Sequence, residues 1–215
     1  MISAIVLAAG KSERMGSPKA LLPIFGRTFL ENILDAVSRT SIEETIVVVG
    51  HHQKEIEAAI RLPAERKRDS AQPQKSERKR DSAQPHKSFV LNPDYEKGMI
   101  TSFQTGIRAL SSDASGAFLF LVDHPLVEPA TIEALIMNLA PNRIVLPTFE
   151  GRRGHPVLFS SEVLEEILAL PSTEGANIVV RKDPGRVIEV PVNAPGILVD
   201  VDTPEQFEKL RRDYP

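Results

Sequence analysis

The chain has 215 residues, of which 41% are hydrophobic and 26% are charged, as expected for one globular α/β domain with a sizeable core. Its formal net charge of −3 argues against a strongly basic nucleic-acid-binding protein. The absence of cysteine excludes disulfides, thiolate zinc sites, iron–sulfur clusters and a cysteine nucleophile.

The predicted elements alternate between strands and helices along the chain. The first apolar run has no basic leader and is too short to span a membrane, so we expect a cytoplasmic protein without a membrane partner. Further apolar runs predict buried strands, and amphipathic or capped stretches predict helices between them. The expected strands are Ile2–Ala8, 45–50, 89–92, 117–123, 143–149, 155–159, 187–192 and 197–201. The expected helices are 28–38, 53–61, 100–110, 129–139, 162–170 and one starting at Thr203.

This alternation predicts an α/β fold of three layers (αβα), with a doubly wound, mostly parallel, Rossmann-like sheet in a single domain. Ligands of such sheets bind beyond the carboxyl ends of the strands. We therefore expect the chemistry just after Ala8, Gly50, Asn92 and Asp123. Capping boxes are predicted at Thr28 and at Thr203.

A tandem repeat interrupts the pattern at residues 65–88. Residues 65–76 read ERKRDSAQPQKS and residues 77–88 read ERKRDSAQPHKS. The two copies carry eight basic and four acidic residues, a charge of +4, which leaves −7 on the other 191 residues. Because Ala71 and Ala83 are the only hydrophobic residues here, we expect a flexible surface loop inserted in a domain spanning 1–215. A basic arm that attracts anionic ligands is the alternative.

The segment after the first strand reads LAAGKSERMGSPK and covers residues 7–19. Small residues there let backbone N–H groups approach a phosphate, while Arg14 and Lys19 can neutralise its charge. Five residues separate Gly10 from Gly16, so the segment is neither a Walker loop nor a dinucleotide fingerprint. On these residues alone, a flexible turn with solvated charges is also open.

The same segment resembles the signature of the nucleotidyltransferases related to molybdenum cofactor guanylyl- and cytidylyltransferases. Four later segments follow in that family's order, with Val122 standing where the family commonly has Gly. The double alanine at Ala8 and Ala9 resembles the cytidylyltransferase branch. The four segments are NP with KGMITS from Asn92 to Ser102, VDHP at 122–125, GHPV at 154–157 and DVDTPE at 200–205.

The resemblance implies a role for each of these segments. Arg14, Lys19 and Asp123 would be catalytic, and Asp123 with Asp202 would bind Mg²⁺, which favours oxygen ligands and substrate phosphates. His155 would bind the acceptor. The nucleotide would be bound by Leu7, Ala8, Ala9, Gly10, Arg14, Lys19, Asn92, Gly98 and Ser102.

Most of these residues also have a structural interpretation. Asp123 and Asp202 could cap the turns that follow them, Asn92 could cap the turn into Pro93, and His155 could be a loop histidine. Asp200 is a weaker metal candidate, placed by strand alternation on the same face as Asp202. His51 and His52 read as turn residues, and without cysteine or a tight histidine–carboxylate cluster we expect no zinc site.

The expected function is therefore Mg²⁺-dependent transfer of CMP from CTP to the phosphate of molybdopterin cofactor, with release of pyrophosphate. A nucleotidyltransferase that uses GTP, or one that acts on a sugar phosphate or another cofactor phosphate, is one alternative. A non-catalytic carrier that hands a pterin cofactor to a molybdenum enzyme is another. The expected partners are a nucleoside triphosphate, a phosphate-bearing acceptor and a recipient molybdenum enzyme, and no nucleic acid.

Overall fold

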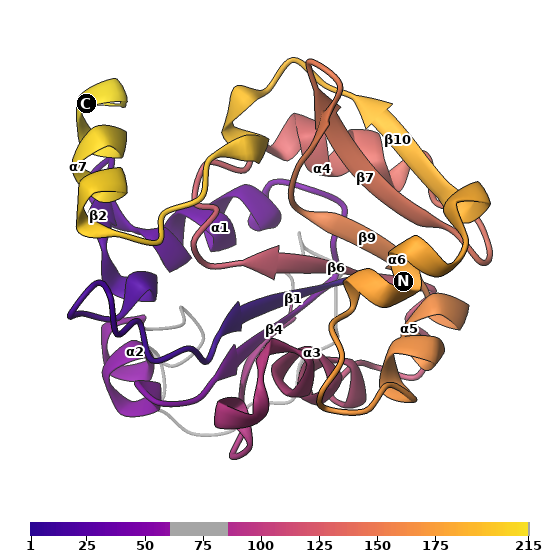
Figure 1. Cartoon of the computed structure of the whole chain (residues 1–215), viewed down its shortest axis with the longest axis horizontal. Helices are drawn as coiled ribbons and strands as arrows, with labels where there is room; N and C mark the ends of the chain where they lie inside the picture. The colour runs from indigo at the N-terminus through magenta and orange to yellow at the C-terminus, as the bar shows by residue number, and fades with distance from the viewer. Residues whose placement is uncertain (61–85, 215) are drawn as a thin grey trace, which may run out of the picture.

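The computed structural model describes residues 1–60 and 86–214 of the chain (Figure 1). The predicted surface loop at 65–88 therefore lies outside the described residues, except for its last three. Those three residues begin a strand at His86, three positions earlier than the sequence predicted. Lys87 pairs there with Thr45 of the neighbouring strand, so the end of the second repeat copy belongs to the sheet.

The centre of the molecule is an eight-stranded sheet in the order β10-β7-β9-β6-β1-β4-β5, with β8 paired to β7. Most neighbours run parallel, while β9 runs antiparallel to both β6 and β7. A separate hairpin joins β2 and β3. The strands are β1 Ile2–Ala8, β2 Pro23–Ile24, β3 Arg27–Thr28, β4 Glu44–Val49, β5 His86–Leu91, β6 Gly116–Leu121, β7 Ile144–Phe149, β8 Arg152–Arg153, β9 Val157–Ser160 and β10 Val187–Pro191.

Helices cover both faces of the sheet, as predicted for a three-layer domain (Figure 1). The α-helices are α1 Phe29–Ser38, α2 Gln53–Ala59, α3 Met99–Arg108, α4 Pro129–Ile136, α5 Ser161–Leu168, α6 Asn177–Lys182 and α7 Pro204–Asp213. The 3₁₀-helices include η1 Lys19–Leu21, η3 Tyr95–Lys97, η4 Pro184–Arg186 and η5 Pro195–Leu198. None of the helices within 1–60 and 86–214 is long and apolar enough to cross a bilayer.

Each face of the sheet has its own hydrophobic core, because side chains alternate between the two faces along β1. Val6 points to the face covered by α1, α2 and α4, where it packs in one cluster with Leu30 and Ile132. Ile5 points to the other face and packs with Phe103 of α3 and Ile167 of α5. Because β1 is buried on both faces, its end is a rigid base for the loop that follows it.

Both predicted capping boxes are confirmed, and they begin α1 and α7. The Thr28 side chain accepts a hydrogen bond from the Glu31 backbone, and the Glu31 carboxylate accepts one from the Thr28 backbone. Thr203 and Gln206 make the same reciprocal pair at the start of α7. Each box satisfies backbone N–H groups that the first turn of a helix leaves without intrahelical partners.

The strand predicted at 197–201 is wrong. The 3₁₀-helix η5 covers Pro195–Leu198, and Val199 donates locally to the Gly196 carbonyl at 3.1 Å. Val201 donates to the Asp123 carbonyl at 3.0 Å, so this apolar segment is buried against a loop without pairing to a strand. A short apolar run indicates burial, but its length cannot distinguish a strand from irregular backbone.

Candidate active site

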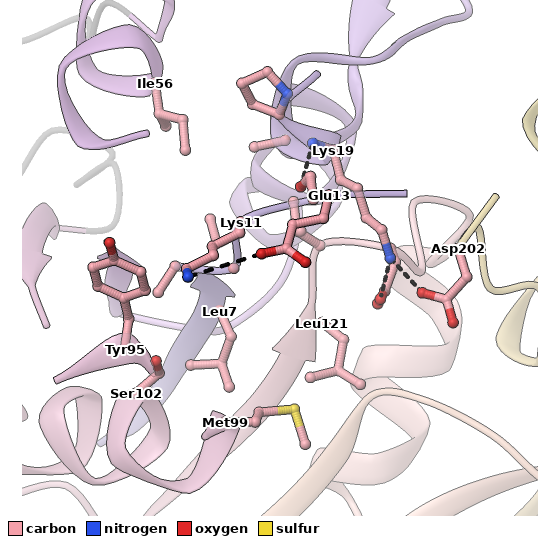
Figure 2. Close-up of a pocket in the computed structure, with 18 of the residues that line it drawn as sticks. Leu7, Lys11, Glu13, Lys19, Ile56, Tyr95, Met99, Ser102, Leu121 and Asp202 are labelled. Carbon is pink, nitrogen blue, oxygen red and sulfur yellow. Dashed lines mark hydrogen bonds and ion pairs between the residues drawn. The ribbon is translucent and has the colours of Figure 1, made fainter. Parts of the chain in front are cut away.

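A cleft of about 540 Å³ lies at the carboxyl ends of β1 and β6 (Figure 2). It is lined by the loop that follows β1, by η3 and the start of α3, by the residues that follow β6, and by Asp202. This is the edge of the sheet where the sequence predicted the chemistry. The cleft brings together segments of the chain that are far apart in sequence.

Four charged residues form one cluster at one end of the cleft. The Lys19 ammonium donates to Asp123 Oδ2 at 3.2 Å. It also donates to Asp202 Oδ1, as Figure 2 shows. The Arg14 guanidinium lies 3.3 Å from the other oxygen of Asp202. Lys19 is largely buried, with 13% of its side chain exposed. The hydrogen bond from Lys19 is the main cause that holds the pKa of Asp202 below its ordinary value.

Local backbone structure positions each member of this cluster. Ser12, which has a φ of 54°, accepts a hydrogen bond through its side chain from the Lys19 backbone at 3.1 Å. The backbone of Asp202 donates to the Gln206 side chain at 2.7 Å, so the capping box of α7 also orients this carboxylate. Asp123 follows β6 by two residues, and its carbonyl accepts the hydrogen bond from Val201.

The two carboxylates fit a divalent cation. Asp123 Oδ1 is buried and has no hydrogen-bonding partner among the described residues, whereas Oδ2 faces a cation. Unpaired carboxylate oxygen is the ligand that hard cations prefer, and magnesium sites commonly use only one or two carboxylates plus substrate phosphates. In 1–60 and 86–214 no group of three histidine, cysteine or acidic side chains is arranged to hold a metal. Asp200 is exposed and does not line the cleft.

The loop that starts at the end of β1 forms one wall of the cleft. Leu7, Ala8, Ala9 and Gly10 all line it. A Cβ at Gly10 would meet nothing within 4 Å, so the backbone here is open to a ligand. A Cβ at Gly50 would lie 2.6 Å from the Ala9 carbonyl, so the absence of a side chain lets this loop lie against the end of β4.

The structure places Asn92 behind the wall of the cleft. Its side chain is buried and donates to the hydroxyl oxygens of Thr101 and Ser102, both at 2.9 Å. Its amide oxygen accepts from the Asp94 backbone at 2.9 Å. These contacts are those of the turn-capping alternative, and the direct contact with a nucleotide that the resemblance implied has no support in this geometry. Ser102 does line the cleft.

Gly98 is the N-cap of α3 and also lies outside the cleft lining. Its φ of 113° is in the region that favours glycine, and a Cβ there would lie 3.7 Å from the Ser172 carbonyl. The nucleotide contact that the resemblance implied for Gly98 therefore stays a prediction, and Met99 and Ser102 are the α3 residues that line the cleft itself.

His155 also lies away from the cleft lining. Its ring contacts that of His124 in a tilted arrangement, with the centroids 4.7 Å apart and 43° between the ring planes. The Nδ1 atoms of both rings are buried without a partner among the described residues. Burial lowers the pKa of His155 to about 4, and the adjacent His124 acts in the same direction. A Cβ at Gly154 would lie 2.5 Å from the Ile197 carbonyl. The Gly-His-Pro segment therefore packs against η5, and the acceptor-binding role of His155 stays a prediction.

Sequence reasoning missed a second charged pair in the cleft. Lys11 Nζ lies 2.7 Å from Glu96 Oε1 and joins the loop after β1 to η3. Tyr95 lines the same end, and a 3.1 Å hydrogen bond links its hydroxyl to His51 Nδ1. A further hydrogen bond of 3.2 Å links His52 Nε2 to the Lys11 carbonyl. The two histidine hydrogen bonds join residues more than 40 positions apart in the sequence, and local sequence patterns do not reveal such contacts.

Known proteins resemble this chain over almost its whole length. Nicotine blue oxidoreductase of Paenarthrobacter nicotinovorans is 26% identical over 218 residues, covering 97% of this chain and 96% of that protein. The molybdenum cofactor cytidylyltransferase of Escherichia coli is 27% identical over 219 residues, covering 99% and 97%.

A solved structure shares the fold. The Mycobacterium tuberculosis protein Rv0371c superposes with a TM-score of 0.78 at 27% identity, covering 98% of this chain and 97% of that one. It has also been solved in complex with manganese, at a TM-score of 0.75 and 25% identity. Residues 4–187 match the family described as the MobA-like NTP transferase domain. The match covers most of the chain and the whole loop that carries Arg14 and Lys19, and the chain therefore belongs to the MobA-like NTP transferase family.

Proposed function

We propose that this protein transfers CMP from CTP to the phosphate of molybdopterin cofactor and releases pyrophosphate. The observation that carries the proposal is the cluster of Lys19, Arg14, Asp123 and Asp202 at one end of the cleft. Membership of the MobA-like family supports nucleotidyl transfer. The similarity to a molybdenum cofactor cytidylyltransferase and the double alanine at Ala8 and Ala9 support cytidine and this acceptor.

The triphosphate is proposed to lie along the loop after β1. Gly10 leaves its backbone open, and Arg14 and Lys19 supply the positive charge that phosphate oxygens need. Leu7, Ala8 and Ala9 are then placed to contact the nucleoside part, with Ser102 on the facing wall. Asn92 takes an indirect role, because its side chain positions Ser102.

Mg²⁺ is the proposed metal, with Asp123 and Asp202 as its protein ligands. Asp123 Oδ1 has no hydrogen-bonding partner within 1–60 and 86–214, and this oxygen supports a divalent cation here, as does the similarity to a protein solved with manganese. When bound, such an ion would neutralise charge that develops on the phosphates. The two carboxylates leave room for phosphate oxygens to complete its coordination, as magnesium sites commonly do.

The protein's own groups account for the rest of the transfer. An oxygen of the acceptor phosphate attacks the α-phosphorus in line, a new phosphorus–oxygen bond forms, and the bond to the pyrophosphate leaving group breaks. No general base is required, because the acceptor oxygen is already ionised. Lys19 and Arg14 would move from the carboxylates to the phosphates and stabilise the charge that accumulates there.

Pyrophosphate release is the direct test. The protein is incubated with molybdopterin cofactor, Mg²⁺ and, in turn, CTP, GTP, ATP or UTP. We expect release with CTP, loss of release with a chelator, and loss of release in the Asp123→Ala variant. Preferential release with GTP would favour the guanylyl alternative. Tight binding of the cofactor without pyrophosphate release from any nucleotide would favour a carrier and overturn the proposal.

The recipient molybdenum enzyme, the absence of nucleic-acid and membrane partners and the cytoplasmic location stay predictions from the sequence.

A further inference from the structure

The cleft has a second charged pair at the end away from the cluster. Figure 2 places Tyr95 and Asp202 on opposite sides of the cleft, with Lys11 extending toward the Tyr95 side. Lys11 Nζ lies 2.7 Å from Glu96 Oε1. A triphosphate that uses Arg14 and Lys19 leaves this end for the base, so Lys11 and Glu96 lie where a base would be recognised.

Two adjacent histidines contact the residues on both sides of this pair, one through a side chain and one through the backbone. The His51 ring bonds to the hydroxyl of Tyr95, the neighbour of Glu96, and the His52 ring bonds to the carbonyl of Lys11. The two rings contact each other edge to face, with centroids 4.6 Å apart. His51 and His52 thus position both partners from a single turn after β4, which preorganises the pair.

The pair keeps hydrogen-bonding capacity beyond its own contact. An ammonium has three donors and a carboxylate has about four acceptor positions, of which the mutual contact uses one each. The contact raises the pKa of Lys11 and lowers that of Glu96, so both groups are charged at neutral pH. The end of the cleft therefore presents a charged acceptor next to a charged donor, with Glu13 Oε1 3.8 Å from the same ammonium.

We propose that Lys11 and Glu96 read the base of the nucleotide and select cytosine against uracil. Cytosine presents an exocyclic amino donor beside a ring-nitrogen acceptor, which matches the Glu96 carboxylate and the Lys11 ammonium. Uracil presents a carbonyl and an N–H at the same positions, so acceptor would face acceptor and donor would face donor. Carboxylate recognition of the cytosine amino group also occurs in nucleic-acid complexes. The inference rests on the proposed function and specifies how it chooses its nucleotide.

The test measures dissociation constants of the full chain for CTP and UTP in the presence of Mg²⁺. The two nucleotides are nearly equal in size, so the ratio of their constants isolates the hydrogen-bonding pattern. We expect wild type to prefer CTP, and E96Q to reduce that preference by at least about tenfold, because a hydrogen bond to a charged group is lost. The matched control is Lys97→Ala, which breaks the 2.9 Å ion pair to Asp94 in the same 3₁₀-helix without touching the cleft lining.

A double exchange separates base recognition from a merely structural link. K11E/E96K restores an ion pair with reversed polarity, and we expect it to prefer UTP. A folded E96Q that retains the wild-type preference, or a double variant that still prefers CTP, would overturn the inference and leave the proposed transferase intact. Wild-type binding that does not distinguish CTP from UTP would do the same. Absence of both nucleotide binding and pyrophosphate release would overturn the proposed function as well.

Discussion

Lys19 donates to Asp123 across 104 residues of sequence, with 3.2 Å between Nζ and Oδ2. The same ammonium also holds Asp202, which in turn lies 3.3 Å from Arg14. Two basic side chains thus neutralise two carboxylates in the protein without metal or nucleotide. A metal ion must compete with Lys19 for these oxygens, whereas a triphosphate that attracts Lys19 and Arg14 would free them. Metal and nucleotide should therefore bind cooperatively.

Replacing Lys19 by methionine should separate its competition with the metal ion from its contact with the phosphates. We expect the affinity of the nucleotide-free protein for Mn²⁺ to rise about tenfold, because a charged hydrogen-bonding partner of both carboxylates is lost. Nucleotidyl transfer should fall by a factor of about 10²–10³, because a group that stabilises charge on the phosphates is missing. Mn²⁺ titration and pyrophosphate release measure the two quantities. The matched control is Lys54→Met, which alters an exposed lysine of α2 outside the cleft lining and should change neither quantity. Unchanged Mn²⁺ affinity in Lys19→Met would contradict the competition.

Removing the Asp123 carboxylate should impair turnover far more than nucleotide affinity. We expect Asp123→Ala to lower kcat by a factor of at least about 10² while the dissociation constant for CTP changes only a few-fold, because the metal ion that Asp123 is proposed to hold neutralises charge that develops in the transition state. Single-turnover pyrophosphate release and equilibrium CTP binding supply the comparison. Asp200→Ala, which alters an exposed carboxylate on the same segment as Asp202, should retain activity. Near-normal release in Asp123→Ala would remove this residue from the reaction.

Asn92 should be important mainly for stability. Its buried side chain joins Thr101, Ser102 and the Asp94 backbone, so Asn92→Ala would leave buried polar groups without partners. We expect the free energy of unfolding to fall by about 1–3 kcal/mol, as measured by urea denaturation. Asn138→Ala, which removes an exposed amide bonded to the Ala134 carbonyl, should change it by less than about 0.5 kcal/mol. Equal losses in the two variants would refute the structural role of Asn92.

The buried His155 predicts a loss of stability under mildly acidic conditions. Its pKa is about 4 in the folded protein, whereas an unfolded histidine titrates near about 6.5. The unfolded chain therefore takes up this proton first, and the free energy of unfolding should fall as pH decreases from about 6.5 toward 4, by at most about 3 kcal/mol. His124, whose pKa is also lowered by burial, acts in the same direction.

Denaturation curves across this pH range test the histidine effect. His155→Leu should flatten the decline above about pH 4.5, where carboxyl groups with lowered pKa values such as Asp202 stay ionised. His86→Leu alters an exposed histidine at the start of β5 and should leave the slope unchanged. An identical slope in wild type and His155→Leu would show that His155 does not set the pH dependence.

Features encoded by neighbouring residues could be predicted from the sequence. The capping boxes at Thr28 and Thr203 depend on side chains three positions apart, and the buried strand β1 depends on a continuous apolar run. The meeting of Lys19 with Asp123 was also predictable, because both follow central parallel strands whose carboxyl ends share one edge of the sheet. The spacing of residues along the chain and the arrangement of parallel strands in the sheet were sufficient to predict these features.

Other features depend on long-range contacts that one sequence does not reveal. Whether Asn92 faces a ligand or is occupied by Thr101 and Ser102 depends on how α3 packs after β5. Likewise His155 is buried because η5 lies against Gly154. The sequence pattern predicted a strand at 197–201, which overlaps η5. The Lys11–Glu96 pair connects two loops whose separation is set by the sheet. In each case the tertiary partner of a polar side chain determined its role.

The reversed direction of β9 also determines how the site can vary. Parallel strands bring the loops that follow them to the cleft edge, whereas β9, antiparallel to β6, brings the segment that precedes it. The loop that follows β1 thus belongs to the first half of the chain, and the Gly154–His155 segment reaches the same edge of the sheet, outside the cleft lining, from the second half by the opposite route. A change in the length of the segment between β8 and β9 would remodel that side of the protein without shifting the register of β1. The loop that follows β1 and the Gly154–His155 segment can therefore diverge independently, because they enter this edge of the sheet through strands of opposite direction.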